Sequence, residues 1–185
     1  MNPINIDPNV SAINLTAKSP HVKYGDGPPY VANFANDFEL QFAGVVSERI
    51  QRKIEEIGLH TYTTYFGYVS HQKALELQRS SQVLLLIEID AEKTKGIIAG
   101  KLFEYMAAER PIIGIGPKDA DISKIIQETN TGTYFLYTDK AKLKAQIVAY
   151  YEAFKAKQLQ TFPIGLQQYS RKALTEKLAN VLHGL

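Results

Sequence analysis

Apolar and polar residues alternate along this chain with two different periods. Runs that are β-branched, aromatic or continuously apolar are typical of strands and lie at 38–46, 61–69, 82–89, 111–115 and 133–137. Helical spacing of apolar residues predicts helices at about 48–57, 71–80, 101–109 and 121–129, followed by two longer helices. Strands that alternate with helices indicate βαβ units, so we expect an α/β fold. More closely, we predict a Rossmann-like, mostly parallel sheet of about six strands with helices on both faces.

The first 36 residues break this rhythm. Residues 24–29 combine glycine, aspartate and two prolines, which is turn chemistry rather than the interior of an element. A weak strand at 21–24 is the most that we expect there. The sequence therefore predicts an irregular segment over 1–36 and a Rossmann-like domain over 37–185.

Residues at the expected helix ends support these boundaries. Ser47 and Ser70 are suitable N-caps, and Gly58 stands where a glycine commonly ends a helix. We expect Ile50, Ile54 and Ile57 to face the core from the helix between them.

Composition narrows the class of protein. With 185 residues, 45% hydrophobic and 22% charged, the chain suits a soluble globular domain. Its 21 basic and 19 acidic residues leave a net charge of +2, too little to favour nucleic acid binding. The absence of cysteine excludes disulfides and thiolate metal sites. We find neither a signal peptide nor a membrane-length apolar run, so we expect a cytoplasmic protein.

The most informative stretch is 96–113. Ligands of parallel sheets bind beyond the carboxyl ends of the strands, and this stretch follows the strand at 82–89. Gly100 and Lys101 open the next helix, where amides and an ammonium group suit phosphate, and the carboxylate of Glu104 suits sugar hydroxyls. A simpler interpretation remains open: Gly100 only starts the helix, Lys101 is solvated, and Glu104 complements the helix dipole.

Three pieces of the chain together resemble the C-terminal half of GT-B glycosyltransferases. They are Phe-Gly-Tyr-Val-Ser-His at 66–71, Ser-Gln-Val-Leu-Leu-Leu at 81–86, and the fourteen residues from Gly100 to Ile113. Residues 125–132 fit the pattern that follows, so the resemblance runs from about Phe38 to the end of the chain. The likeness is to retaining-type bacterial enzymes of surface polysaccharide synthesis.

The resemblance implies a role for each matched residue. Glu104 is similar to the glutamate that holds the ribose hydroxyls, and Gly100 with Lys101 to the diphosphate-facing start of the helix. Tyr68 and Val69 stand where the family's main chain passes the nucleobase. The implied ligand is a nucleoside-diphosphate sugar, with no separate cofactor and no metal. We assign no catalytic residue, and His71 fits a first-turn helix residue better than an acid or base.

Two departures from the family limit what the chain does alone. Many retaining members carry a second, sugar-binding glutamate eight positions before the first, and here Gly96 occupies that position. The length of 185 residues supplies one of the two domains of a GT-B enzyme, so we expect an inactive half that lacks its N-terminal acceptor-binding domain. The complete enzyme would work in the cytoplasm, at the inner face of the membrane. The apolar face of the last helix, which carries Leu174, Leu178 and Leu182, would be exposed in isolation and could drive self-association.

Other functions compete with this interpretation. One is half of a nucleotide-sugar epimerase-like enzyme, whose acidic and histidine catalytic groups we do not find. Another is a non-catalytic nucleotide-binding or interaction domain. A receiver-type domain would need acidic residues after its first strand, and a nicotinamide site would need a Gly-x-Gly-x-x-Gly motif; the chain has neither.

Overall fold

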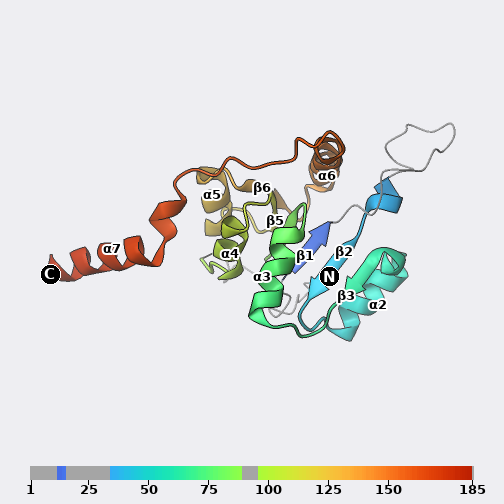
Figure 1. Ribbon diagram of the computed structural model, residues 1–185, viewed down its shortest axis with the longest axis horizontal. Helices are drawn as coiled ribbons and strands as arrows, with labels where there is room; N and C mark the ends of the chain where they lie inside the picture. Colours follow the sequence, from blue (N-terminus) through green and yellow to red (C-terminus); the bar gives the residue numbers. More distant parts are fainter. Residues whose placement is uncertain (1–11, 16–33, 89–95, 185) are drawn as a thin grey trace.

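Strands and helices alternate along the chain, so the expected α/β class is confirmed (Figure 1). The computed structural model describes residues 12–15, 34–88 and 96–184. The elements are, in order, β1 (Ala12–Leu15), β2 (Leu40–Ala43), α2 (Glu48–Glu56), η1 (His60–Tyr62), β3 (Thr63–Tyr65), α3 (His71–Ser80), β4 (Leu84–Ile87), α4 (Lys101–Ala107), β5 (Ile112–Gly116), α5 (Asp121–Glu128), β6 (Gly132–Leu136), α6 (Lys140–Lys155), η3 (Leu166–Tyr169) and α7 (Arg171–His183).

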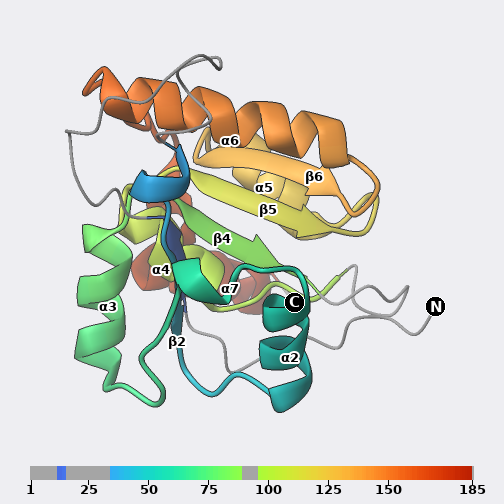
Figure 2. The same ribbon diagram turned by 90° about the vertical axis from the view of Figure 1, so that its right-hand side faces the viewer.

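The parallel strands form two groups rather than one continuous run of about six. The sheet order is β3-β2-β1-β4-β5-β6, in which β2 and β3 are parallel and β4, β5 and β6 are parallel. Figure 2 shows the arrows of β4, β5 and β6 pointing the same way. β1 lies between the groups and is antiparallel to both neighbours. The predicted mostly parallel sheet of about six strands is therefore corrected in its arrangement: its parallel strands fall into groups of two and three, with the antiparallel β1 between them.

β1 comes from the stretch that was expected to be irregular. Its four residues are too few to show a period of two in the sequence, so the pattern gave no reason to expect it. The weak strand expected at 21–24 lies outside the described residues. The division of the chain at residue 37 stays a prediction.

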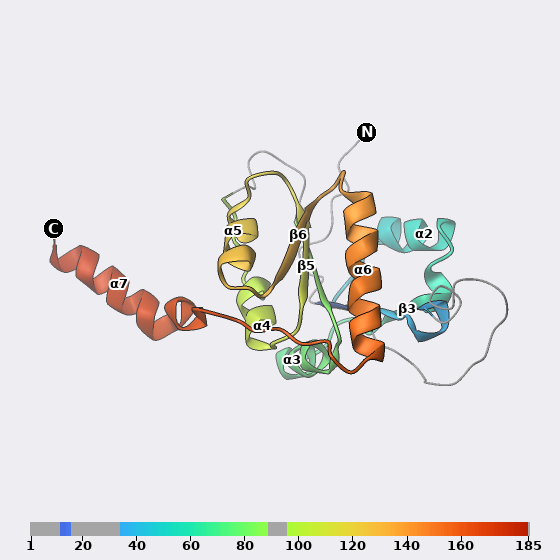
Figure 3. The ribbon, with the colours of Figure 1, turned by 90° about the horizontal axis from the view of Figure 1, so that it is seen from above.

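Helices cover both faces of the larger parallel group. Alternate residues of β4 and β5, Leu84, Leu86 and Ile112 among them, pack with buried residues of α4 and α5. On the opposite face Val83, Ile113 and Phe135 pack against α6. Figure 3 shows α4 and α5 on one side of the strands and α6 on the other. This arrangement fixes the start of α4 relative to β4, which carries the candidate site.

Helix ends agree with the sequence in most respects. The Ser70 hydroxyl accepts from the amide of Lys73 at 3.2 Å and caps α3. Ser47 takes the extended conformation of an N-cap but makes no side-chain capping bond. Gly58 has φ +74°, the left-handed conformation that favours glycine after a helix. Ile57 was expected to face the core and is exposed, because it follows the last residue of α2.

The last helix stands apart from the rest of the fold. Figures 1 and 3 show α7 projecting away from the sheet. None of its residues is buried, and Leu174, Leu178 and Leu182 are exposed. η3 just before it is anchored, since the ring of Tyr169 lies 5.7 Å from the ring of Phe103 on α4. In the described part of the chain no helix has the length and apolar character to cross a membrane.

Candidate functional site

The side chain of Glu104 projects from α4 on the side that faces α3. Leu102, Tyr105 and Met106 of α4 are buried in the core and fix the rotation of the helix. The Glu104 side chain keeps 37% of its surface exposed. The candidate carboxylate is therefore held on a packed helix and remains accessible.

Two residues of α3 approach this carboxylate. The Nε2 of Gln78 donates to Glu104 Oε2 at 2.9 Å, and Gln78 itself is fully buried. His71 Nδ1 lies 4.0 Å from Glu104 Oε1, and its side chain is 72% exposed. Because 4.0 Å exceeds hydrogen-bond length, the two Glu104 oxygens have different surroundings. One oxygen is held by the protein and the other faces the exposed start of α3.

The start of α4 has a tight turn. The amide of Leu102 donates to Ala99 O at 2.9 Å, and that of Phe103 donates to Gly100 O at 3.2 Å. We expected amides at the start of this helix to suit phosphate, and these two of them are engaged within the turn. Gly100 has φ −54° and ψ −31°, and a Cβ placed there would meet nothing within 4 Å. Lys101 is partly buried at the first helical position.

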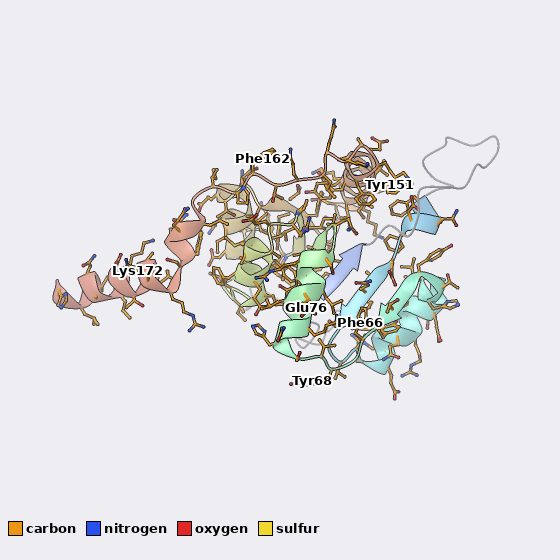
Figure 4. All side chains as sticks on the ribbon, in the orientation of Figure 1. Phe66, Tyr68, Glu76, Tyr151, Phe162 and Lys172 are labelled. Carbon is orange, nitrogen blue, oxygen red and sulfur yellow. The ribbon has the colours of Figure 1, made fainter. Side chains whose placement is uncertain are left out.

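The loop that contains Tyr68 and Val69 leads directly into α3. The amide of Gly44 donates to Gly67 O at 2.8 Å, so the loops after β2 and β3 lie side by side. Gly67 has φ +63°, which places the turn before Tyr68. Tyr68 is 89% exposed (Figure 4), and the next residue, Val69, is half-buried. The chain thus places both residues just ahead of His71, whose Nδ1 lies 4.0 Å from Glu104 Oε1.

Gly96 lies against the start of α5. A Cβ at this glycine would be 4.0 Å from Asp121 Oδ2. Asp121 is the first residue of α5 and pairs with Lys124 at 2.8 Å. Gly96 therefore lies close to the carboxyl end of β5, at the edge expected from the topology.

A second acidic group at this edge was missed by sequence reasoning. Glu88 directly follows β4, is 9% exposed, and accepts from the Tyr134 hydroxyl through Oε1 at 2.6 Å. The same hydroxyl lies 3.1 Å from Pro117 O, and the Tyr137 hydroxyl donates to the main-chain carbonyl of Glu88. The cluster of Glu88, Tyr134 and Tyr137 joins β4 to β6 across β5.

Two glycines of β5 make this contact across a strand possible. A Cβ at Gly116 would collide with the Tyr134 hydroxyl and lie 2.8 Å from Glu88 Oε1. A Cβ at Gly114 would lie 2.6 Å from Cδ2 of the Tyr134 ring. The signal in the sequence is an acid that ends an apolar strand, followed by a Gly-x-Gly strand and then by Tyr134.

Burial dominates the electrostatics of this cluster. Removal from water raises the pKa of Glu88, and the hydrogen bond from Tyr134 opposes part of that rise. The pKa of Tyr134 is raised by burial first, and then by its hydrogen bond to Glu88 and by the charge of that group. Glu88 thus favours the neutral form of Tyr134, whereas the hydrogen bond from Tyr134 favours the ionised form of Glu88 against the effect of burial.

Among the described residues no group of three or more histidine and acidic side chains could hold a metal ion. No model of a known protein family matches the chain, and no curated protein matches its sequence.

Proposed function

We propose that this chain is the donor-binding domain of a glycosyltransferase, one half of a GT-B fold, that binds a nucleoside-diphosphate sugar. The observation that carries the proposal is the carboxylate of Glu104. It projects from a packed helix beside the carboxyl edge of parallel strands, one of its oxygens accepts from Gln78, and the side chain keeps 37% of its surface exposed. Carboxylates with a free oxygen accept readily from sugar hydroxyls.

The proposed roles follow from this position. Glu104 accepts from the ribose hydroxyls, and the loop at Tyr68 and Val69 passes the base just before α3. Lys101 supplies the positive charge for the diphosphate. Since the amides of Leu102 and Phe103 are engaged in the turn, this binding would rest on Lys101 more than on the helix amides. Stabilising the departing diphosphate is the electrostatic task of such a site during transfer.

Transfer itself would need a second, acceptor-binding domain. Apolar residues on the loops of the carboxyl edge are exposed, and they include Val45, Phe66 and Ile97. The apolar face of α7 is exposed as well. Such surfaces suit contact with another domain or another copy of the chain. They also favour the second candidate, a nucleotide-binding interaction domain without catalysis.

Titration calorimetry with UDP, GDP and ADP tests the proposal. We expect one of them to bind the 185-residue chain, and Glu104→Gln to weaken this binding about ten- to a hundredfold because a charge-assisted hydrogen bond is lost. Glutamine at this position still offers Gln78 an acceptor, so the fold is preserved. Glu109→Gln, at an exposed residue just beyond the C-terminal end of α4, is the control and should bind as the wild type does. No binding of any nucleotide, or equal affinity in Glu104→Gln, would count against the function.

A further inference from the structure

Gln78 is a polar side chain in a place that suits an apolar one. It is fully buried on α3 beside the buried residues Ala74 and Leu77. Its Nε2 has one partner, Glu104 Oε2, and its Oε1 is buried without any hydrogen-bond partner. Burying an amide with half of its hydrogen bonds unmade is unfavourable. The hydrogen bond to Glu104 is therefore the favourable polar interaction that this buried side chain makes.

The orientation of the amide is determined by its partner. Turning it over would bring Gln78 Oε1 against Glu104 Oε2, two acceptors facing each other. The donor must therefore face the carboxylate, as it does at 2.9 Å. Since the Gln78 side chain is surrounded by protein, it holds Glu104 Oε2 at a fixed point.

This contact leaves one edge of the carboxylate for a ligand. Glu104 Oε1 lies 4.0 Å from His71 Nδ1, too far for a hydrogen bond, and the side chain is partly exposed. Glu104 Oε2 keeps a second lone pair beside the one that the amide uses. Two oxygens held in one orientation match two adjacent hydroxyls, as in the 2′,3′-diol of a ribose.

We propose that Gln78 is a positioning residue that aligns the Glu104 carboxylate with a vicinal diol, and so gives the site its preference for ribonucleotides over 2′-deoxyribonucleotides. This inference rests on the proposed function. It adds Gln78 as a residue that acts on the site without touching the ligand. It also names the 2′-hydroxyl as the feature of the nucleotide that the site selects.

The test compares each nucleotide with its 2′-deoxy form. Calorimetry would give the dissociation constants for UDP and dUDP, GDP and dGDP, and ADP and dADP with the 185-residue chain and with Gln78→Met. We expect the wild type to prefer the ribo form of its best nucleotide at least about tenfold, and Gln78→Met to reduce that preference below about threefold. Methionine keeps the length of the side chain without the donor, so the helix packing is retained.

The chain provides a matched control in Gln82. This residue also has a buried Oε1 without a partner, but its Nε2 donates to Ser80 O at 3.3 Å and not to Glu104. Gln82→Met should keep the preference of the wild type. If Gln78→Met proves unstable to heat, Gln78→Leu replaces it, because leucine also lacks the donor and suits the buried position beside Ala74 and Leu77.

The outcomes separate this inference from the function. The inference is overturned if the wild type shows no preference for the ribonucleotide, or if Gln78→Met keeps the preference of the wild type. It is also overturned if Gln78→Met weakens binding of the ribo and the 2′-deoxy nucleotide equally, because Gln78 would then have a structural role alone. In each of these cases the function stands as long as Glu104→Gln weakens binding. Absence of any nucleotide binding, in contrast, removes the function and the inference together.

Discussion

Glu88 and Glu104 belong to the same βα unit, yet their surroundings differ. Glu88 ends a strand, is almost fully buried, and is held by the hydroxyl of Tyr134 across β5. Glu104 lies in the first turn of α4, accepts from the Gln78 amide, and keeps 37% of its side-chain surface exposed. The glycines near them differ too: Gly116 has no room for a methyl group, and Gly100 has open space.

The difference teaches which acid is available for chemistry. The Glu88 carboxyl is enclosed with an aromatic partner, and its raised pKa reflects the cost of a charge there. The Glu104 carboxylate combines a fixed orientation with an open side, which a binding group needs. We therefore regard Glu88 as a residue that joins three strands and Glu104 as the binding group.

Gly116→Ala should have the largest effect on this contrast. Its methyl group would collide with the Tyr134 hydroxyl and crowd Glu88, so the contact across β5 must open. We expect the free energy of unfolding to fall by about 3 kcal/mol, from overpacking and a lost hydrogen bond to a charged group. Chemical denaturation followed by circular dichroism measures this change.

A double variant identifies the cause. In a Tyr134→Phe background the colliding hydroxyl is absent, so Gly116→Ala should cost clearly less than in the wild type. An equal cost in both backgrounds would show that Gly116 is required for some other reason. The joining role of the cluster would then be wrong.

Glu88→Gln is the next, smaller test, because the hydrogen bond from Tyr134 can be kept. The pKa of Glu88 lies above its ordinary value of 4.5, so the folded chain binds the proton more tightly than the unfolded chain does. The stability of the wild type should therefore fall as the pH rises above 4.5, until the folded carboxyl has ionised. Glutamine cannot ionise, so the variant should be the more stable protein at neutral pH.

Denaturant unfolding curves of the wild type and of Glu88→Gln, recorded about every pH unit between roughly pH 4 and pH 8, measure this change. The free energy of unfolding of Glu88→Gln relative to the wild type should increase with pH, and it should become constant once the folded Glu88 carboxyl has ionised. A variant that is less stable at neutral pH would mean that the Glu88 charge is needed, and that it resembles Glu104 more than we infer.

Much of the fold was predictable because the period of the pattern is a local property. The limits of α3 agree with the predicted 71–80, and α5 ends one residue before the predicted 129. The predicted strands at 38–46 and 61–69 are longer than β2 and β3, since apolar residues continue into the loops. The antiparallel β1 could not be predicted, because four residues carry no direction of pairing.

The candidate site was predictable only in part. The glycine-flanked start of α4 indicated Glu104 and Lys101, since spacing within one helix is visible in the sequence. Gln78 lies 26 positions before Glu104 on another helix, so only the packing of α3 against α4 joins them. The contact of Glu88 with Tyr134 spans 46 positions and depends on two glycines of a third strand.

Gly100→Ala should have the smallest effect of these substitutions, and it tests the surroundings of Glu104 rather than those of Glu88. Gly100 has helical angles, makes no capping bond, and has space for a methyl group. Alanine should therefore raise the free energy of unfolding by about 0.4–1 kcal/mol, because the unfolded chain has fewer conformations to lose. If a diphosphate approaches this backbone, the same methyl group should weaken nucleotide binding by about threefold, with each nucleotide and its 2′-deoxy form affected alike. Denaturation and calorimetry on one sample separate the two effects. If Gly100→Ala lowers the free energy of unfolding instead, the start of α4 is packed as closely as the cluster around Glu88. Glu104 would then not be the accessible acid.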